Sequence, residues 1–275
     1  MTPEIRDELE RYPLTGRFLM GRLRGDMSLE EREQLESLIC QTEQVNDGEY
    51  VIRAGETSDV STILIQGFMV RSLVKNGQRH AVSFHVPGDF VDLHCFALKK
   101  LDHNVECIGP VRYGHVRHRD ISRIMQTMPH LARLFWFQTL LDAALHREKI
   151  VKLEQLTVPR RIAHLFAEIW RRLEMVGLAF PDGFATPMTQ VDIADLCGAT
   201  AVHTNRAVAE LRNSGIADLK RGEVRVADRS ALESYGHFEG DYLYGEGSLK
   251  LRGFDMYTPP EPAGRLPRRP IEKGR

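Results

Sequence analysis

The sequence contains few cysteines, no long apolar run and no excess of either charge. Its 275 residues include four cysteines, and 37 Lys and Arg residues nearly balance 38 Asp and Glu residues. Because the cysteines are scattered and form no C-x-x-C pair, a disulfide framework and a cysteine-only metal cluster are excluded. No apolar run approaches the length of a membrane span, and the charged N-terminus is unlike a secretory signal. We therefore expect a cytoplasmic protein with no membrane partner. Because the net charge is close to zero, a surface that binds nucleic acid would need positive charge concentrated in one place.

Signatures of catalysis are also missing. We find no G-x-S-x-G, no glycine-rich phosphate loop and no paired catalytic acids. The first half is rich in possible metal ligands, namely His80, His85, His94, His103, His115, His118, Cys95 and Cys107. Their spacing fits no standard zinc or haem motif, so hydrogen-bonded or surface histidines are favoured, and no cofactor is predicted. An enzyme is not predicted, although a cupin-like roll with a metal at these histidines remains an alternative that metal analysis would test.

Short strands separated by glycine turns dominate the first half. A capping box at 28–31 should begin a short helix that runs to about Cys40. β-Branched and aromatic runs predict strands at 50–52, 62–65, 68–73, 81–86 and 111–117. Asn76-Gly77 is typical of a type I′ turn, so 70–74 and 80–86 should form a hairpin. Strict alternation in its second strand would place Val82, Phe84 and Val86 on one side and Ala81, Ser83 and His85 on the other. This pattern predicts a roll or barrel.

A long apolar helix follows the strands. Helical character begins near Asp120, breaks at Met128-Pro129, and resumes from about Pro129 to Gln155. A helix of this length packs either on its own domain or on a second copy, and we favour a homodimer. The expected partner-facing residues are Phe137, Leu141, Ala144, Leu145 and Val151. A hinge is expected at 157–160, where Pro159 can begin a new helix that runs to about Leu173.

Residues 189–228 carry the most informative pattern. Val191, Ile193, Ala194 and Leu196 form one apolar helix face, and Cys197-Gly198-Ala199 is a sharp turn. Thr200 is a suitable N-cap for a second helix. That helix has a core face of Thr204, Ala207, Val208 and Leu211, and an opposite face of Val202, His203, Asn205, Arg206 and Ala209. The arrangement predicts a helix-turn-helix, whose second helix can enter the major groove of DNA. Periodicity alone leaves ordinary core packing open.

A β-hairpin wing should follow the two helices. Residues 216–219 and 223–226 flank Lys220-Arg221-Gly222, which places two cations near the tip. Arg160, Arg161, Arg171 and Arg172 add positive charge nearby in the sequence. Cations in such places typically bind phosphates and position a protein on DNA without reading its sequence.

These segments resemble a known family. The stretch TQVDIADLCGATAVHTNRAVAELRNSGIADL, with PDG before it and the wing after it, resembles the DNA-binding half of the cyclic-AMP receptor protein and fumarate–nitrate regulator (Crp/Fnr) family. GEYVIRAGE, the strand pair around Gly67 and PGDF at 87–90 resemble its sensor half. The resemblance covers roughly 28–244 and implies a transcription regulator that binds palindromic double-stranded DNA as a homodimer. It also implies RNA polymerase as a partner.

The resemblance assigns roles to individual residues. The family's central recognition-helix arginine falls on Arg206, whereas two further reading positions fall on the non-polar Ala201 and Val202. His203 and Asn205 are expected to share base reading with Arg206. The complete predicted DNA-binding set is Thr200, Val202, His203, Asn205, Arg206, Lys220 and Arg221.

The sensor half departs from the cyclic-nucleotide binders of the family. Those proteins have Gly-Glu-Leu after the PGDF-like turn and an Arg-Ser or Arg-Thr pair further on, for the ribose and the cyclic phosphate. Here Asp92 is the nearest substitute for the glutamate, and Asp102 lies where an arginine would pair the phosphate. We therefore expect an effector other than cyclic AMP, with Asp92 and His103 as candidate contacts. The cysteine cluster of the oxygen-sensing branch is also absent.

The resulting prediction is an α+β fold with an N-terminal cyclic-nucleotide-binding-like β-roll (jelly roll), a central dimerisation helix and a C-terminal winged helix-turn-helix. The expected divisions are 1–128 for the sensor, 129–156 for the dimerisation helix and 157–244 for the DNA-binding domain. A Gly-, Pro- and charge-rich tail at 245–275 is not expected to fold. The alternative is a sensor or scaffold that binds only protein. A steep salt dependence of binding to an inverted-repeat duplex would distinguish the two functions.

Overall fold

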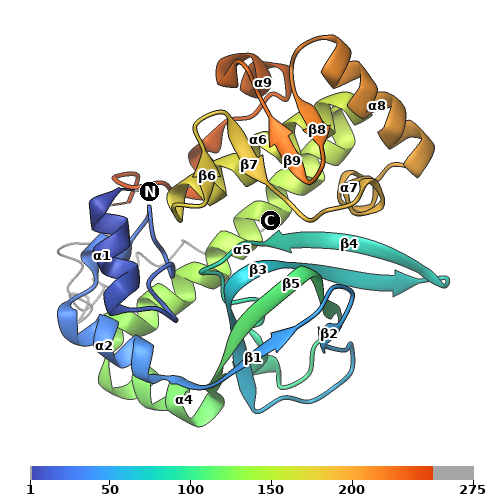
Figure 1. Ribbon diagram of the computed structural model, residues 1–275. Helices are drawn as coiled ribbons and strands as arrows, with labels where there is room; N and C mark the ends of the chain where they lie inside the picture. The colour runs from blue at the N-terminus through green and yellow to red at the C-terminus, as the bar shows by residue number, and fades with distance from the viewer. Residues whose placement is uncertain (1, 250–275) are drawn as a thin grey trace, which may run out of the picture.

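The computed structural model describes residues 2–249 of the chain. Figure 1 shows a β-rich part below, a group of small helices and strands above, and a long helix, α5, between them. We call the part from α1 to α4 the sensor half and the part from α6 to η2 the reader domain. This α+β arrangement, with a β-roll, a central helix and a C-terminal helix-turn-helix, confirms the predicted fold class.

The sensor half contains the longer strands. Its elements are α1 (Pro3–Arg11), η1 (Arg24–Asp26), α2 (Leu29–Ser37), β1 (Ile39–Val45), β2 (Tyr50–Ile52), β3 (Val60–Lys75), β4 (Gln78–His85), α3 (Cys95–Leu98), β5 (Asn104–Arg117) and α4 (His118–Thr127). The strands form one antiparallel sheet in the order β1-β5-β3-β4, and β2 also pairs with β5. The pairing of β3 with β5 shifts register twice, on either side of Gln66, and shifts of this kind bend a sheet.

The hairpin expected around Asn76-Gly77 is confirmed and is longer than predicted. β3 and β4 pair from Met69↔His85 to Lys75↔Gln78, and both turn residues have positive φ. Strict alternation fails in β4, because Ser83 pairs with Arg71 while Ala81 pairs with Ser72. The register shift leaves Val82 without a Cα partner, and Ala81, Phe84 and Val86 all join one apolar core. A bulge of this kind cannot be read from a two-residue period.

The capping box at Ser28 is present, but the helix that it begins is shorter than predicted. Ser28 Oγ accepts from the backbone N–H of Glu31, and the Glu31 carboxylate accepts from the Ser28 N–H. The helix ends at Ser37, and Ile39 already pairs with Val116 of β5. Strand pairing with the sheet therefore replaces the last helical turn that the sequence predicts.

The central helix α5 (Pro129–Gln155) has the predicted bounds, with proline in its first turn. Its buried side packs on the sensor half, where Phe135 meets Phe18 and Phe90 edge to face. The set of partner-facing residues expected from the sequence is mostly wrong. Phe137, Leu141 and Ala144 are buried within the chain, and Leu145 packs partly on the same cores. The exposed apolar side chains of α5 are instead Trp136, Leu140, Ile150 and Val151.

The reader domain follows α5 after a two-residue link. Its elements are α6 (Val158–Met175), β6 (Ala179–Phe180), β7 (Gly183–Ala185), α7 (Gln190–Cys197), α8 (Ala201–Asn213), β8 (Asp218–Lys220), β9 (Glu223–Arg225), α9 (Arg229–Tyr235) and η2 (Gly240–Leu243). Its four short strands form a second sheet in the order β6-β7-β9-β8. Phe84 and Val86 of the sensor half lie in the same apolar core as Phe166 and Leu196 of the reader domain. The two parts therefore share a continuous core.

The segment after Tyr244 returns to the sensor half. The backbone N–H of Glu246 donates to the carbonyl of Gly21 at 2.9 Å, and the ring of Tyr244 packs edge to face on Phe137. Residues 245–249 therefore make defined contacts, although the tail prediction included them; the rest of that prediction, 250–275, lies outside the described residues. Within residues 2–249, no helix is both long enough and apolar enough to cross a membrane.

Candidate nucleic-acid interface

The first helix of the predicted motif, α7, is capped at both ends. Thr189 Oγ1 accepts from the N–H of Asp192, and the Asp192 carboxylate accepts from the N–H of Thr189. The helix stops at Gly198, which has the left-handed φ and ψ of 60° and 45°. A Cβ at Gly198 would also lie 3.0 Å from a methyl of Leu153 on α5, so the turn is closely packed. The apolar face predicted for α7 is wrong at Val191, which is 58% exposed.

The second helix, α8, begins at the predicted N-cap. Thr200 Oγ1 accepts from the N–H of His203 at 3.3 Å. The predicted core face of α8 is confirmed, since Thr204, Ala207, Val208 and Leu211 are all buried. The opposite face is exposed along its first two turns, where Val202, His203, Asn205 and Arg206 lie. This helix–turn–helix projects at the outer corner of the reader domain (Figure 1).

The polar side chains on the exposed face of α8 are not engaged elsewhere. Among residues 2–249, the side chains of His203, Asn205 and Arg206 have no hydrogen-bond or ion-pair partner. Glu210, one turn beyond Arg206, accepts a hydrogen bond from the hydroxyl of Tyr235 at 2.8 Å. A salt bridge between Arg206 and Glu210, which would compete with a role for Arg206 in binding, is therefore not formed in the described structure.

The wing is the β8–β9 hairpin. Leu219 pairs with Val224, and the two-residue turn Arg221-Gly222 has φ values of 55° and 79°. Both positive angles give the turn type that matches the twist of a hairpin. Lys220 and Arg221 are exposed at the tip, and neither side chain has a polar partner among the described residues.

The four arginines expected to add positive charge near the motif have other roles. Arg172 is buried and pairs with Asp89 of the sensor half, and Arg161 donates to three backbone carbonyls. Arg171 pairs with Glu174, whereas Arg160 contacts His237 and lies over the ring of Tyr235. Because each side chain is engaged within the chain, the cations of the reader domain without a polar partner among the described residues are Arg206 on α8 and Lys220 and Arg221 on the wing.

Comparison with known proteins also finds a helix-turn-helix domain in this part of the chain. A Crp-like helix-turn-helix domain matches residues 160–235. The chain is 28% identical over 192 residues to the transcriptional activator protein FnrL of Cereibacter sphaeroides, which covers 67% of this chain and 76% of FnrL. It is 24% identical over 189 residues to the nitrogen fixation regulation protein FixK of Bradyrhizobium diazoefficiens, which covers 66% and 78% respectively. The chain belongs to the Crp/Fnr family of DNA-binding transcription regulators.

Solved structures share the fold of this Crp/Fnr regulator. FixK2 from Bradyrhizobium japonicum superposes with a TM-score of 0.65 at 22% identity, over 71% of this chain and 96% of FixK2. The CRP-family regulator TTHB099 from Thermus thermophilus superposes with a TM-score of 0.57 at 18% identity, over 71% and 96%. The order of sensor, long helix and reader is therefore that of this family.

The two candidate effector contacts of this Crp/Fnr regulator lie inside the sensor half. Asp92 is fully buried, and its carboxylate accepts from the N–H and the hydroxyl of Thr62. Burial outweighs these hydrogen bonds and raises the pKa of Asp92 to about 7. His103 is buried, with Nδ1 2.7 Å from Asp102, while its Nε2 has no partner among the described residues. The Asp92 carboxylate is therefore bound to Thr62 of the roll, and of these two candidates His103 is the one with an unsatisfied polar atom.

Arg71 is a buried cation that sequence reasoning missed. It lies on β3, with Nη1 2.7 Å from Asp142 of α5 and Nη2 donating to the carbonyl of Val91. Its Nε and the neighbouring Ser72 hydroxyl are buried without partners in the described chain. The available signal was an arginine inside the largely apolar run 68–74. Within residues 2–249, no three His, Cys, Asp or Glu side chains are placed to hold a metal ion.

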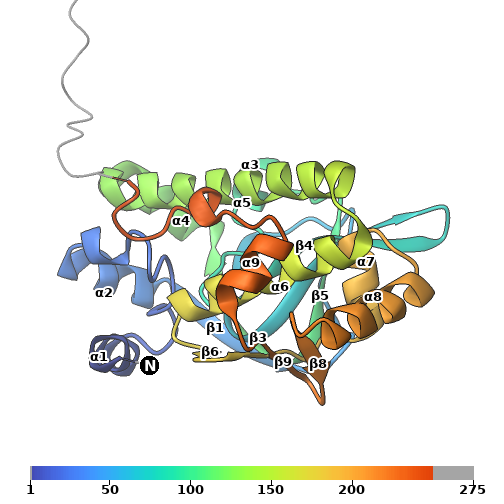
Figure 2. The same ribbon diagram turned by 90° about the horizontal axis from the view of Figure 1, so that it is seen from above.

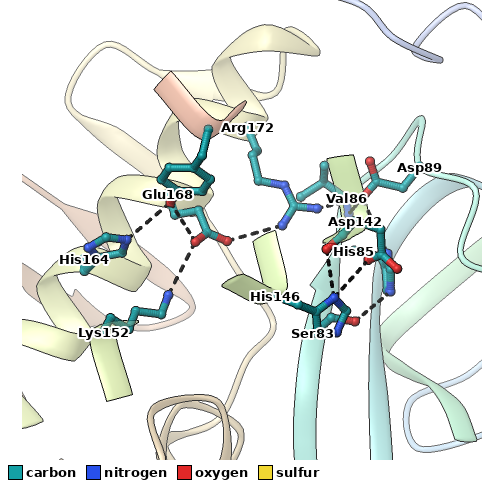
Figure 3. Close-up of polar contacts among 11 residues, drawn as sticks. Ser83, His85, Val86, Asp89, Asp142, His146, Lys152, His164, Glu168 and Arg172 are labelled. Carbon is teal, nitrogen blue, oxygen red and sulfur yellow. Dashed lines mark hydrogen bonds and ion pairs between the residues drawn. The ribbon is translucent and has the colours of Figure 1, made fainter. Parts of the chain in front are cut away.

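A buried polar network joins α5, the sensor half and the reader domain of this regulator (Figure 3). Arg172 of α6 lies 2.7 Å from Asp89 and 3.5 Å from Glu168, and Glu168 also pairs with Lys152 of α5 at 3.4 Å. Burial opposes ionisation of Glu168, but the charges of Lys152 and Arg172 lower its pKa to about 2. Burial lowers the pKa of the adjacent His164 to about 4. The network is therefore charged on Glu168 and neutral on His164 at neutral pH.

A second polar contact joins the β3–β4 hairpin to the helix-turn-helix. Arg79 of β4 lies 2.7 Å from Asp195 and 3.3 Å from Asp192, both on α7, and 2.6 Å from Glu106 of β5. These carboxylates raise the pKa of Arg79 although its partial burial acts in the opposite direction. Arg79 thus joins the sensor half directly to α7, the first helix of the helix-turn-helix.

Proposed function

We propose that this Crp/Fnr regulator binds palindromic sites in double-stranded DNA as a homodimer, with α8 of each copy in the major groove. The observation that carries the proposal is the exposed face of α8, on which His203, Asn205 and Arg206 have no partner among the described residues. An exposed helix with free donors on its first turns has the form that reads base edges.

Each residue in this interface has a distinct proposed role. The Arg206 guanidinium is suited to O6 and N7 of guanine, while His203 and Asn205 offer hydrogen bonds to neighbouring bases. Val202, 61% exposed, is suited to apolar contact with a thymine methyl group. Thr200, at the start of α8, and the wing cations Lys220 and Arg221 would contact phosphates, which position the protein without reading the sequence.

The proposed dimer interface is the outer face of α5. Trp136, Leu140, Ala143, Arg147 and Ile150 follow one another at intervals of four and three residues, and only Ala143 is not exposed. This is the spacing of a two-stranded coiled-coil seam. Figure 2 shows α5 along one edge of the molecule, where a second copy could approach. A dimer on this face would present two recognition helices to successive major grooves, about 34 Å apart.

The sensor half is proposed to respond to an effector other than cyclic AMP. Asp102 projects into solvent where the cyclic-nucleotide binders of the family pair a phosphate, and its side chain is 89% exposed. Arg71, the buried arginine of the roll, is already paired with Asp142. Calorimetry with cyclic AMP at micromolar concentration should therefore give no saturable binding, and saturable heat would contradict this part of the proposal.

Selection of bound sequences from a random duplex pool tests the proposed function. The selected sequences should contain an inverted repeat, and affinity for that repeat should fall steeply with salt concentration as phosphate contacts release counterions. RNA polymerase, the expected partner of a transcription regulator, can then be added on a template that carries the selected site. Recovery of no common sequence, with binding insensitive to salt, would instead favour the alternative of a scaffold that binds only protein.

A further inference from the structure

A cleft of about 590 Å³ lies where three parts of the chain meet, and no residue of α8 or of the wing lines it. Arg17 of the segment after α1 forms one wall, Ile65, Phe68 and Arg112 of the sensor sheet form another, and Leu173 and Leu178 of the reader domain close it. Each of the three parts also contributes a proline to the lining. This volume is within the range of sites that bind small organic molecules.

The lining combines an apolar surface with positive charge only. Most of its side chains are aliphatic, aromatic or proline, and its polar side chains are Gln66, Arg17 and Arg112. No acidic side chain lines the cleft in the described part of the chain. An apolar cleft with cations and no carboxylate is complementary to an apolar molecule that carries a negative charge.

The two guanidinium groups are available for such a charge. Arg17 donates through Nε to the carbonyl of Val176 at 3.2 Å, and neither Arg17 nor Arg112 pairs with a carboxylate among residues 2–249. Arg17 is partly buried, and the loss of water around its charge lowers its pKa. A cation that has lost part of its water without gaining a carboxylate benefits from binding an anion.

The walls of the cleft are held by close backbone packing. A Cβ at Gly88 would lie 2.3 Å from the carbonyl oxygen of Arg17, so the segment that carries Arg17 lies directly on the turn after β4. A Cβ at Gly67 would lie 2.4 Å from the carbonyl oxygen of Pro110, and Gly67 has a φ of +88°. Because both contacts exclude a side chain, the sensor-side walls keep a fixed separation.

We propose that this cleft binds a small aliphatic monocarboxylate, with its carboxylate on Arg17 and Arg112 and its hydrocarbon chain against Ile65, Phe68 and Leu173. A single negative charge suits two guanidinium groups that remain partly solvated, and each can form paired hydrogen bonds to a carboxylate. The chain's own residues 250–275 are a poor occupant, since they contain more Lys and Arg than Asp and Glu. Bound acid would bridge the sensor half and the reader domain.

Calorimetry with octanoate, with 1-octanol and octylammonium as matched ligands, tests the proposal on the full chain without DNA. Octanoate should bind saturably, whereas the neutral and cationic ligands should bind at least tenfold more weakly. Arg112→Gln removes one guanidinium, and Leu178→Glu adds a carboxylate to the wall; each should weaken octanoate binding by tenfold or more. Arg119→Gln, at an exposed arginine outside the cleft, should leave affinity unchanged.

Thermal unfolding followed by circular dichroism confirms that each variant is folded before its affinity is compared. Leu178 is partly exposed, so Leu178→Glu is expected to fold. It therefore tests the proposal independently of Arg112→Gln, which changes a residue of the sheet. Absence of saturable octanoate binding to the parent at millimolar concentration would overturn the proposal. Equal affinity in the parent, Arg112→Gln and Leu178→Glu would do so as well, because the acid would then bind elsewhere. The experiment does not depend on DNA binding, so its outcome is separate from that of the proposed function.

Discussion

Arg172 of α6 and Asp89, in the turn after β4, form an ion pair with a distance of 2.7 Å between Nη2 and Oδ2. Both side chains are buried, and the pair ties the reader domain to the sensor half. Arg172→Ala leaves Asp89 and Glu168 charged in the interior, which should lower the free energy of unfolding by roughly 3–5 kcal/mol. The matched change Arg171→Ala, at a largely exposed pair with Glu174, should cost less than about 1 kcal/mol. Urea denaturation measures both values, and equal losses would contradict the importance of the buried pair.

Asp92 should make the protein less stable as pH rises. Its folded pKa of about 7 exceeds that of an unfolded aspartate, so its contribution to stability is complete below about pH 4 and is lost as pH rises through 7. Asp92→Asn keeps an oxygen acceptor for the Thr62 N–H but does not titrate. The fall in unfolding free energy from pH 5 to pH 8 should be roughly 2–3 kcal/mol smaller in the variant.

The comparison between parent and variant is essential, because other groups titrate in the opposite sense. Burial lowers the pKa of both His94 and His164 to about 4, so their neutral forms are favoured in the folded state. Their contribution to stability is complete above about pH 6.5 and is lost as pH falls toward 4. Identical pH profiles for the parent and Asp92→Asn would show that Asp92 does not titrate in this range.

Arg79 should limit the motion of the helix-turn-helix relative to the sensor half. Arg79→Ala leaves Glu106, Asp192 and Asp195 facing one another without a cation, so local opening of α7 should become easier. Hydrogen exchange measured by mass spectrometry should be about tenfold faster in peptides that cover α7. Arg53→Ala, at an arginine over the ring of Tyr50, serves as the control on the same half. Unchanged exchange in α7 would show that the apolar core alone holds the motif.

The outer face of α5 should control self-association. Leu140→Glu places a charge in the middle of the proposed seam, in both copies of a dimer. Loss of the two leucines that the proposed dimer would bury, one from each copy, should weaken dimerisation by about a hundredfold or more. Met125→Glu, at an exposed apolar residue of α4, is the matched control. Analytical ultracentrifugation at micromolar concentration should show a monomer for the first variant and a dimer for the second; a parent that is itself monomeric would contradict the dimer proposal.

Changes at Arg206 and Arg221 should separate base reading from phosphate binding. Arg206→Ala should cost roughly 1–3 kcal/mol per half-site and relax preference at one base position. Arg221→Ala should weaken binding to all sequences alike and reduce the salt slope by about 1 per half-site. Both side chains are exposed, so folding should be unaffected. Competition binding with single-base variants of the selected site distinguishes the two effects, and an unaltered base preference in Arg206→Ala would remove it from the reading set.

Local patterns predicted the helix-turn-helix well because its signals lie within a few residues of one another. The N-cap at Thr200, the left-handed Gly198 and the buried face with Leu211 each follow from short-range backbone chemistry. The wing follows in the same way from the turn at Arg221-Gly222. None of these features requires knowledge of the rest of the chain.

The faces of α5 could not be assigned in this way. Apolar residues occur on both of its sides, and periodicity does not say which side meets the chain's own core. Phe137 and Leu141 were expected at a partner but lie inside, whereas Trp136 and Leu140 lie outside. The contact between Arg79 and Asp195 joins residues that are 116 positions apart, and composition contains no signal for such a pair. The ion pairs of Arg71 and Arg172 could likewise not be read from the sequence, because their partners Asp142 and Asp89 lie far away along the chain.

The Arg161 side chain of α6 binds the backbone on both sides of the turn into this helix. Arg161 donates through Nη2 to Leu153 at 2.7 Å, through Nε to Leu156 at 2.8 Å and through Nη1 to Cys197 at 3.2 Å, in each case to the backbone carbonyl. These carbonyls lie at the C-terminal ends of α5 and α7, so this guanidinium helps to set the angle at which the reader domain leaves the central helix. In a dimer that angle would determine how many base pairs separate the two half-sites. Lysine carries a single ammonium nitrogen, which cannot occupy the positions of Nε, Nη1 and Nη2 together, so the spacing of the two readers would depend on an arginine at position 161.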